Sequence, residues 1–332
     1  MNSVSMAWLI RRHCIEMTAR SGGSHIGSAL SVADILAVLY TGIMQYSPVD
    51  PYFAQRDRLI MSKGHAGLAL YAALAEGGFY PVKDLSTYYQ DGSLFSGHTS
   101  HHVPGVELST GSLGHGLPVA AGIALAGKMD GKAHRVFVIL GDGECDEGSV
   151  WEAALFAAHY RLCRLVTIID HNKMQSMDFC ERTIALGNLS EKWRAFGWNV
   201  LTVDGHDHMA LAAALATDPT DDRPTAIIAH TIKGHGVPFM ENDILWHYRF
   251  PHQGWEYDQA VAALWKNKPI EIDDIYTPVG IPDPTEMGAS SCRDHTMCST
   301  WRGLFWRPDE HSTPSDATCA ERYLECAQEV CL

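Results

Sequence analysis

Short apolar runs alternate with stretches of helical periodicity over the first 270 residues. The apolar runs are bounded by turn residues and predict buried strands at 135–140, 165–170, 199–203 and 226–229. Stretches rich in small apolar residues separate them and predict helices, for example at 117–128 and 150–160. Such alternation predicts an α/β fold, with a mainly parallel sheet covered by helices on both faces.

The N-terminal region predicts two further helices. In the first, apolar residues recur with helical spacing up to Gly22-Gly23, at Met6, Leu9, Ile10 and Ile15. Ser31 is followed three residues later by Asp34, which has the form of a capping box. A second helix is therefore expected to begin at Ser31.

The pattern changes near residue 270. Residues 1–270 are expected to form one continuous α/β domain, whereas 271–332 show no sustained periodicity and are rich in Pro, Ser, Thr and cysteine. This tail, whose role is unknown, is expected to be poorly ordered, with one terminal helix near 320–330. Its residues Cys292, His295 and Cys298 leave a zinc site open as an alternative, although their spacing fits no common zinc pattern.

The composition of the chain excludes some classes of binding partner. The net charge of -14 would repel nucleic acids and anionic membranes, so neither is expected to bind. No apolar run approaches the roughly 20 residues that cross a bilayer, and the first residues lack the layout of a secretory signal. Scattered cysteines favour a reduced, cytoplasmic protein without a disulfide framework, at Cys14, Cys145, Cys163 and Cys180.

The strongest local motif follows two of the predicted strands. Gly141-Asp142-Gly143 comes directly after one strand, and Asn172 follows the next. Because the carboxyl ends of parallel strands meet at one edge, Asp142 and Asn172 should lie close together. Oxygen ligands of this kind suit Mg²⁺, which often shares its coordination sphere with phosphates. Gly141 and Gly143 would let the backbone approach a diphosphate, to which the Gly143 N–H could donate.

This arrangement resembles the thiamine-diphosphate motif, in which GDG is followed about thirty residues later by Asn. Further segments resemble the sequence blocks of transketolases, in family order, at 21–31, 56–66, 96–116 and 231–249. The last block is most similar to that of split, two-subunit transketolases. The likeness covers roughly residues 5–266 and implies the thiamine-diphosphate-binding fold, as the diphosphate-binding domain of an N-terminal subunit.

The resemblance implies a role for individual residues. Asp142 and Asn172 correspond to the side-chain ligands of Mg²⁺ (or of Ca²⁺ or Mn²⁺), and Met174 to the ligand that offers its backbone carbonyl. Contacts to thiamine diphosphate are implied for His65, Gly111, Leu113, Gly114, Asp142, Gly143, Asn172 and His247. Glu147 corresponds to a carboxylate at the interface with the partner domain.

Three histidines are the implied catalytic residues. His25, His98 and His247 correspond to imidazoles that orient the donor ketose and move protons. This assignment makes chemical sense, since ketol transfer needs proton movements near neutral pH, where imidazole titrates. The other histidines that lie near these blocks, His101, His102 and His115, are expected to be ordinary surface residues.

The implied reaction transfers a two-carbon ketol unit from a ketose donor to an aldose acceptor, with thiamine diphosphate supplying the carbanion chemistry. In the family, the glutamate that activates the cofactor lies in a second, pyrimidine-binding domain. Residues 271–332 are too few to build such a domain. A separately encoded C-terminal subunit is therefore expected, in an α₂β₂ heterotetramer that self-associates through the cofactor domain and takes small sugar phosphates.

Departures from the family pattern leave the substrate open. Phe179 follows Asp178 where the family often has Gly, and Ser112 and His115 replace a frequent Pro and Gln. Tyr248-Arg249 follow His247 where many full-length enzymes have Gly. These changes could retune the enzyme toward a modified sugar.

Other functions are weighed against transketolase. One is another thiamine enzyme, such as a deoxyxylulose-phosphate synthase or the α subunit of a 2-oxoacid dehydrogenase; the order of the His25, His65 and His98 blocks favours transketolase. Another is a non-catalytic subunit that kept the fold, against which the intact Asp142 and Asn172 argue. A dinucleotide-binding protein is disfavoured because no Gly-x-Gly-x-x-Gly follows the first strand.

Overall fold

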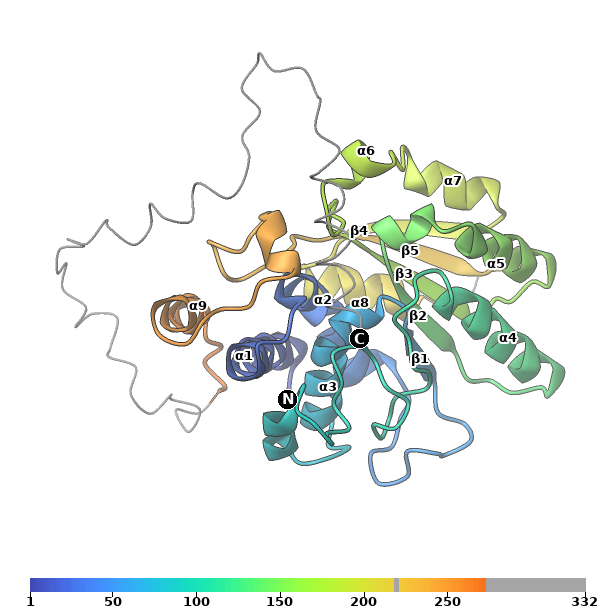
Figure 1. Ribbon diagram of the computed structural model, residues 1–332. Helices are drawn as coiled ribbons and strands as arrows, with labels where there is room; N and C mark the ends of the chain where they lie inside the picture. The colour runs from blue at the N-terminus through green and yellow to red at the C-terminus, as the bar shows by residue number, and fades with distance from the viewer. Residues whose placement is uncertain (218–220, 273–332) are drawn as a thin grey trace, which may run out of the picture. The chain divides into compact units, whose positions relative to one another are not determined.

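Five parallel strands form the central sheet of this computed structural model, which describes residues 1–217 and 221–272 (Figure 1). The strands in chain order are β1 (Arg58–Met61), β2 (Val136–Gly141), β3 (Leu165–His171), β4 (Asn199–Asp204) and β5 (Thr225–His230). They lie in the order β1-β2-β3-β5-β4, and every neighbouring pair is parallel. All carboxyl ends therefore meet at one edge, and the predicted parallel sheet is confirmed.

The strands predicted from apolar runs are present within a residue or two of their expected bounds. Residues 136–140 of β2 are fully buried, as expected for a strand covered on both faces. β4, at one edge of the sheet, is only partly buried. β1 was not predicted, because its apolar run is short and flanked by polar residues.

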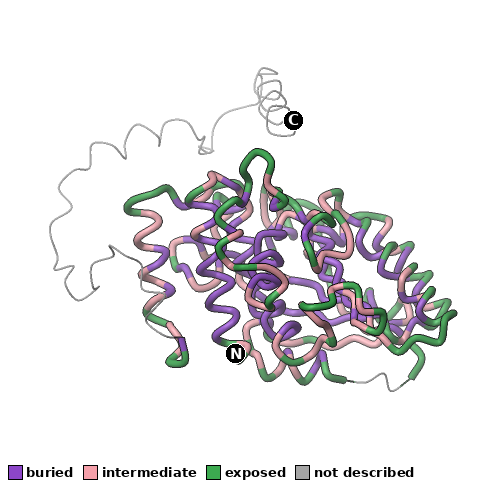
Figure 2. The backbone as a smooth tube through the Cα atoms, turned by 90° about the horizontal axis from the view of Figure 1, so that it is seen from below, coloured by how far each residue is buried: buried purple, intermediate pink, exposed green. Residues whose placement is uncertain are grey.

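Helices cover both faces of the sheet, as the pattern predicted. Successive side chains of β2 point to opposite faces, so Phe137 and Ile139 pack on one side and Val136 and Val138 on the other. The first side carries α1 (Ser3–Ser21), α2 (Ile26–Val38), α3 (Gly67–Glu76), α8 (His208–Ala216) and α9 (Trp255–Lys266). The second carries α4 (Gly116–Met129), α5 (Gly148–His159) and α7 (Leu189–Ala195), and buried residues fill the layers between (Figure 2).

Helix α1 ends where the sequence indicated, but α2 does not begin where it indicated. Gly22 adopts a left-handed conformation (φ 75°) and its N–H donates to the Thr18 carbonyl at 2.9 Å. The capping box expected at Ser31 is wrong: α2 starts at Ile26, after His25, and Ser31 lies inside it. Ser31 and Asp34 are buried in mid-helix, where the Ser31 hydroxyl bonds to Asp170 and to the Ser28 carbonyl, and the Asp34 carboxylate accepts from Arg11.

Among the described residues, one helical run is long and apolar enough to cross a membrane by length and composition alone. Ile26–Ile43 comprises 18 residues with a mean hydropathy of 1.7, closer to a span than the sequence pattern indicated. However, 83% of this run is buried inside the domain, where α2 packs against α1 and α3. It is therefore the core helix of the domain.

The expectations for the tail concern other residues. The poorly ordered tail, its terminal helix and the zinc alternative at Cys292, His295 and Cys298 all lie outside the described residues.

Candidate active site at the carboxyl edge of the sheet

Asp142 and Asn172 come together at the carboxyl edge, as predicted. β2 and β3 are neighbours, with Gly141 opposite Asp170, so both chains leave the sheet at the same level. The Asp142 carboxylate accepts the backbone N–H of Lys173, the residue after Asn172. Asn172 is buried, and its Oδ1 accepts the N–H of Met174 at 3.1 Å. The three expected metal ligands thus occupy one short stretch of the edge.

Asp142 is a buried carboxylate without a cationic partner. It is 2% exposed, and in the part of the chain described here it forms no ion pair with a lysine, arginine or histidine. Burial, with a further contribution from the nearby Asp170 carboxylate, raises its pKa to about 6. A divalent cation at this position would offset both effects, so the site fits a metal ion.

Gly143 has contacts that the motif alone did not indicate. Its N–H donates to Oδ1 of Asp142 at 2.8 Å. A Cβ on Gly143 would lie 2.6 Å from Cγ of Gln175, whose amide donates to Asp146 at 2.6 Å. Glycine is therefore needed here for the close approach of the Gln175 side chain.

Two buried lysines, which were not predicted from the sequence, lie beside these residues. The Lys63 ammonium pairs with Asp170 in the interior. Lys233 is 1% exposed and donates to the Gln175 carbonyl at 2.8 Å, with His247 Nδ1 also at 2.8 Å. Burial, followed by the charge of Lys63, lowers the pKa of Lys233 to about 8. Lys63 lies in the block 56–66 and Lys233 in the block 231–249. The likeness of these blocks to the family was the sequence signal that could have identified both lysines.

Four histidines from distant parts of the chain form a single cluster. The His25 ring centroid lies 5.3 Å from that of His65, 5.5 Å from His98 and 4.9 Å from His247. His247 is buried, His25 and His65 are half-buried, and His98 is exposed. The predicted catalytic and cofactor-binding histidines are therefore brought together, whereas His101, His102 and His115 lie exposed outside the cluster.

His25 carries the clearest sign of a missing ligand. It adopts a left-handed conformation (φ 72°), which is uncommon for a residue other than glycine, and its N–H donates to the His247 carbonyl at 2.9 Å. Its Nδ1 is buried and has no hydrogen-bond partner among the described residues. Burial of a polar atom without a partner is costly, so this nitrogen points to a ligand.

Burial keeps the central imidazoles neutral. The pKa of His25 is lowered to about 4 by burial and by His98, and that of His247 to about 2 by burial and by Lys233. Both rings are neutral at pH 7 and can each donate one hydrogen bond and accept another.

The loop that contains Gly111, Leu113 and Gly114 borders this cluster. A Cβ on Gly111 would lie 3.3 Å from the His98 ring, and Leu113 is half-buried. Gly114 has a φ of 81°, and its N–H donates to the buried Glu144 carboxylate at 2.9 Å. Glu144, also missed from sequence, holds this loop to the end of β2, since it accepts the Gly141 N–H at 3.1 Å as well. Glu147 is exposed at the start of α5.

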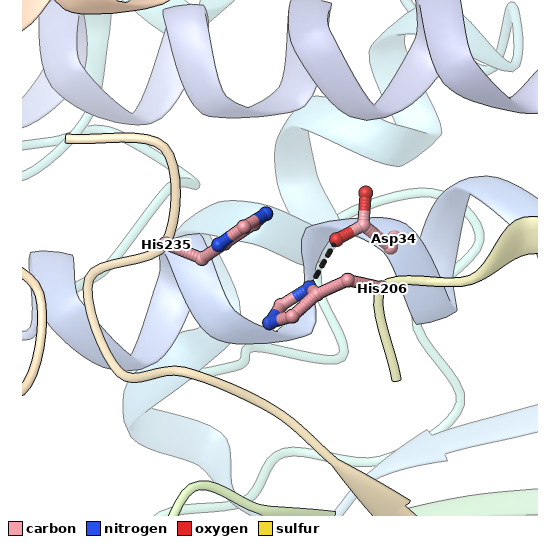
Figure 3. A group of neighbouring side chains, drawn as sticks. All are labelled: Asp34, His206 and His235. Atoms are coloured by element: carbon pink, nitrogen blue, oxygen red, sulfur yellow. Dashed lines mark hydrogen bonds and ion pairs between the residues drawn. The ribbon is translucent and has the colours of Figure 1, made fainter. Parts of the chain in front are cut away.

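A second group of residues resembles a metal site in composition only. Asp34, His206 and His235 lie close together on the first helical side of the sheet (Figure 3). His206 Nδ1 lies 2.6 Å from Oδ2 of Asp34, its Nε2 accepts the Ile232 N–H at 2.9 Å, and Arg11 binds both oxygens of Asp34. The rings of His206 and His235 stack at 3.6 Å. The Asp34 carboxylate is already bound by a guanidinium, and both ring nitrogens of His206 are engaged, so this group does not fit a cation, although Nδ1 of His235 has no hydrogen-bond partner among the described residues.

The chain matches one family model over most of its described length. Residues 3–249 match the thiamine diphosphate binding domain of transketolase. The chain is 40% identical over 261 residues to a 6-deoxy-6-sulfo-D-fructose transketolase subunit of a Clostridium species, covering 78% of this chain and 94% of the relative. It is 40% identical over 255 residues to an apulose-4-phosphate transketolase subunit of Phocaeicola vulgatus, covering 76% and 90%.

Longer relatives match over part of their length only. Human transketolase-like protein 2 is 40% identical over 240 residues, which cover 72% of this chain and 38% of the relative. The crystal structure of transketolase from Campylobacter jejuni superposes with a TM-score of 0.75 at 29% identity, covering 85% of this chain and 45% of that one. The chain thus spans nearly all of the subunit-type relatives but less than half of these longer proteins.

Proposed function

Since the chain belongs to the transketolase family, whose thiamine diphosphate binding domain it matches, we propose that it is the N-terminal subunit of a two-subunit transketolase. In this proposal it transfers a two-carbon ketol unit from a ketose to an aldose. The observation that carries the proposal is the cluster of four histidines, with its unpartnered His25 nitrogen, beside two buried lysines and the buried Asp142.

The residues at the carboxyl edge suit a metal-bound diphosphate. Asp142, Asn172 and the carbonyl of Met174 would hold Mg²⁺ through oxygen ligands. The buried Lys233 ammonium, which has no carboxylate partner among the described residues, favours an anion in the same region. The cofactor contacts are completed by His65, Gly111, Leu113, Gly114, Gly143 and His247. Thiamine diphosphate held by these residues would supply the carbanion chemistry of ketol transfer.

His25, His98 and His247 orient the sugar and move protons at its hydroxyl groups. The neutral His25 and His247 rings can hydrogen-bond to substrate hydroxyls, His247 as a donor from Nε2 because its Nδ1 faces the Lys233 ammonium. His98 is the most exposed of the three and is therefore the first that an entering sugar meets. Exposure of the imidazoles thus increases from His247 through His25 to His98, so a sugar would enter the site from the side of His98.

A partner subunit is part of the proposal. Relatives of similar length are named as subunits, and we assign the pyrimidine-binding domain with its activating glutamate to a separate chain. Exposed apolar side chains on α4 and α5 support self-association through the cofactor domain, at Val119, Leu155 and Phe156. Both helices begin at loops that border the site, and Glu147 stands exposed beside them. An α₂β₂ heterotetramer satisfies both interfaces.

The substrates proposed are small sugars with an anionic group. The relatives are named for a sulfonated fructose and for apulose 4-phosphate, so a phosphate or sulfonate at the far end of the sugar is the shared chemistry. A cytoplasmic location is proposed as well, because the cysteines within the described residues are all free thiols, at Cys14, Cys145, Cys163 and Cys180.

Reconstitution with a partner tests the proposal. The chain is assayed alone and with the product of an adjacent reading frame that encodes a pyrimidine-binding subunit, using xylulose 5-phosphate, 6-deoxy-6-sulfofructose or pyruvate as donor. We expect no transfer by the chain alone and ketol transfer from a ketose by the pair. Turnover by the chain alone would overturn the split arrangement, and consumption of pyruvate without ketol transfer would assign the protein to another class of thiamine enzyme.

A further inference from the structure

Tyr248 stands at the exposed rim of the histidine cluster. Its ring centroid lies 4.8 Å from that of His247 and 5.9 Å from that of His25. The residue is 57% exposed, and its hydroxyl makes no hydrogen bond within residues 1–217 and 221–272. A large side chain with an apolar ring and a free polar tip therefore borders the two imidazoles on their solvent side.

The backbone around Tyr248 is held in place by contacts that do not involve its side chain. Asp243 caps the turn Ile244–His247 by accepting the Leu245 N–H at 3.0 Å. The buried Trp246 donates from Nε1 to the Phe239 carbonyl at 3.0 Å, and the His247 carbonyl accepts the His25 N–H. Tyr248 thus projects from a fixed turn, so its ring can meet a ligand with little loss of conformational entropy.

The neighbouring cation is engaged elsewhere. The Arg249 guanidinium lies 4.7 Å from the Trp246 ring centroid and pairs with Glu256 at 2.5 Å. Its charge is therefore largely neutralised by a carboxylate on α9. Of the two residues that follow His247, Tyr248 is the one that contacts the histidine cluster.

We infer that Tyr248 is a specificity-determining residue, which contacts the part of the sugar that lies beyond the carbons handled by the histidines. The ring face packs against the C–H groups of the polyhydroxylated chain, and the phenol exchanges a hydrogen bond with one of its hydroxyls. A donor that carries no such carbons misses the contact. This inference rests on the proposed function and adds to it the residue that discriminates among donors by length.

Two donors of different length separate this role from a general one. Xylulose 5-phosphate carries three carbons beyond the transferred ketol unit, whereas hydroxypyruvate carries only a carboxylate. In the complex with its partner subunit, Tyr248→Ala is expected to lower kcat/KM for xylulose 5-phosphate by about 10-fold, mainly through KM. For hydroxypyruvate the expected change is less than about 2-fold, and Tyr248→Phe should fall between wild type and Tyr248→Ala for the longer donor.

Tyr52→Ala is the matched control. Tyr52 is a tyrosine with 83% exposure in the segment before β1, and its substitution should leave both donors unaffected. Because Tyr248 is itself exposed, its variants should unfold at the wild-type temperature, which thermal unfolding of each complex verifies.

Each outcome of these assays either supports or overturns the inference. A ratio of kcat/KM values for the two donors that is the same in wild type and Tyr248→Ala would overturn the inference, because Tyr248 would then serve the partner interface or the cofactor rather than the sugar. A wild-type complex that transfers ketol neither from these two donors nor from 6-deoxy-6-sulfofructose would overturn the proposed function, and this inference with it. A selective loss for the longer donor supports both.

Discussion

Two buried carboxylates of this domain differ in how fully the chain satisfies them. Asp34 on α2 accepts hydrogen bonds from Arg11 and has nitrogens of His206 and His208 at 2.6 and 3.0 Å. Asp142, after β2, accepts the backbone N–H groups of Gly143 and Lys173 and forms no ion pair within the described part of the chain. Burial alone would raise the pKa of both, but Arg11 and the histidines hold that of Asp34 well below its usual range, while that of Asp142 is raised to about 6.

The comparison shows how to tell a structural cluster from a binding site. By composition, the Asp34 group is the better metal site, with a carboxylate and histidines close together. However, its carboxylate is already paired with the Arg11 guanidinium and has two histidine nitrogens within hydrogen-bond distance, so its charge is compensated without a metal ion. Within the described residues, Asp142 forms no ion pair. A buried carboxylate without a counter-charge, rather than residue type alone, therefore makes Asp142 the better candidate for a cation site.

The largest effect on stability is expected at Asp34, whose carboxylate is paired with Arg11. Asp34→Asn keeps the shape of the side chain but leaves the buried Arg11 guanidinium without its counter-charge, so the free energy of unfolding should fall by about 3–5 kcal/mol. The matched variant Asp142→Asn should change it by less than about 1 kcal/mol, since no ion pair is broken. Urea unfolding of the two variants measures both values, and equal losses would remove the distinction between the clusters.

A smaller contrast is expected between the two cations. Arg11→Met leaves the buried Asp34 carboxylate without its cation and should lower the free energy of unfolding by about 3 kcal/mol. Lys233→Met should cost about 1 kcal/mol, because removing a buried ammonium whose pKa is already lowered to about 8 offsets part of the hydrogen bonds lost to Gln175 and Met174. The same urea experiment tests this pair, and a Lys233→Met loss as large as that of Arg11→Met would contradict the account.

The smallest effect expected is a dependence on pH. The native pKa of Asp34 is depressed, so its stabilisation is complete above the unfolded pKa of about 3.9 and is lost as the pH falls through the native value. The difference in unfolding free energy between wild type and Asp34→Asn should therefore be constant from pH 5 to 7 and shrink below about pH 4. A difference that shrinks already between pH 7 and 5 would show that another group controls the cluster.

Sequence reasoning could reach the features that depend on local pattern. The buried strands follow from their apolar runs, and the proximity of Asp142 and Asn172 follows from the rule that parallel strands end at one edge. The resemblance to a family was needed to predict that four histidines lie together, His25, His65, His98 and His247, since these residues come from four separate segments.

The features that the sequence could not reach depend on tertiary partners. Ser31 and Asp34 have the spacing of a helix cap, yet their side chains bond to Asp170 on β3 and Arg11 on α1, which no local pattern reveals. The burial of Lys63 and Lys233 is equally invisible, because lysine is normally exposed. The Gly143 N–H appeared free in the motif, but the fold turns the adjacent Asp142 carboxylate toward it.

Ligand-dependent thermal unfolding tests the central claim most directly. Wild type, Asp34→Asn and Asp142→Asn, each with the partner subunit, are heated with and without Mg²⁺ and thiamine diphosphate. At ligand concentrations about 100-fold above Kd, the account predicts that Tm rises by about 5 °C or more for wild type and for the less stable Asp34→Asn, and does not rise for Asp142→Asn. An Asp142→Asn complex whose Tm rises as much as that of wild type would contradict the assignment of this carboxylate to the metal.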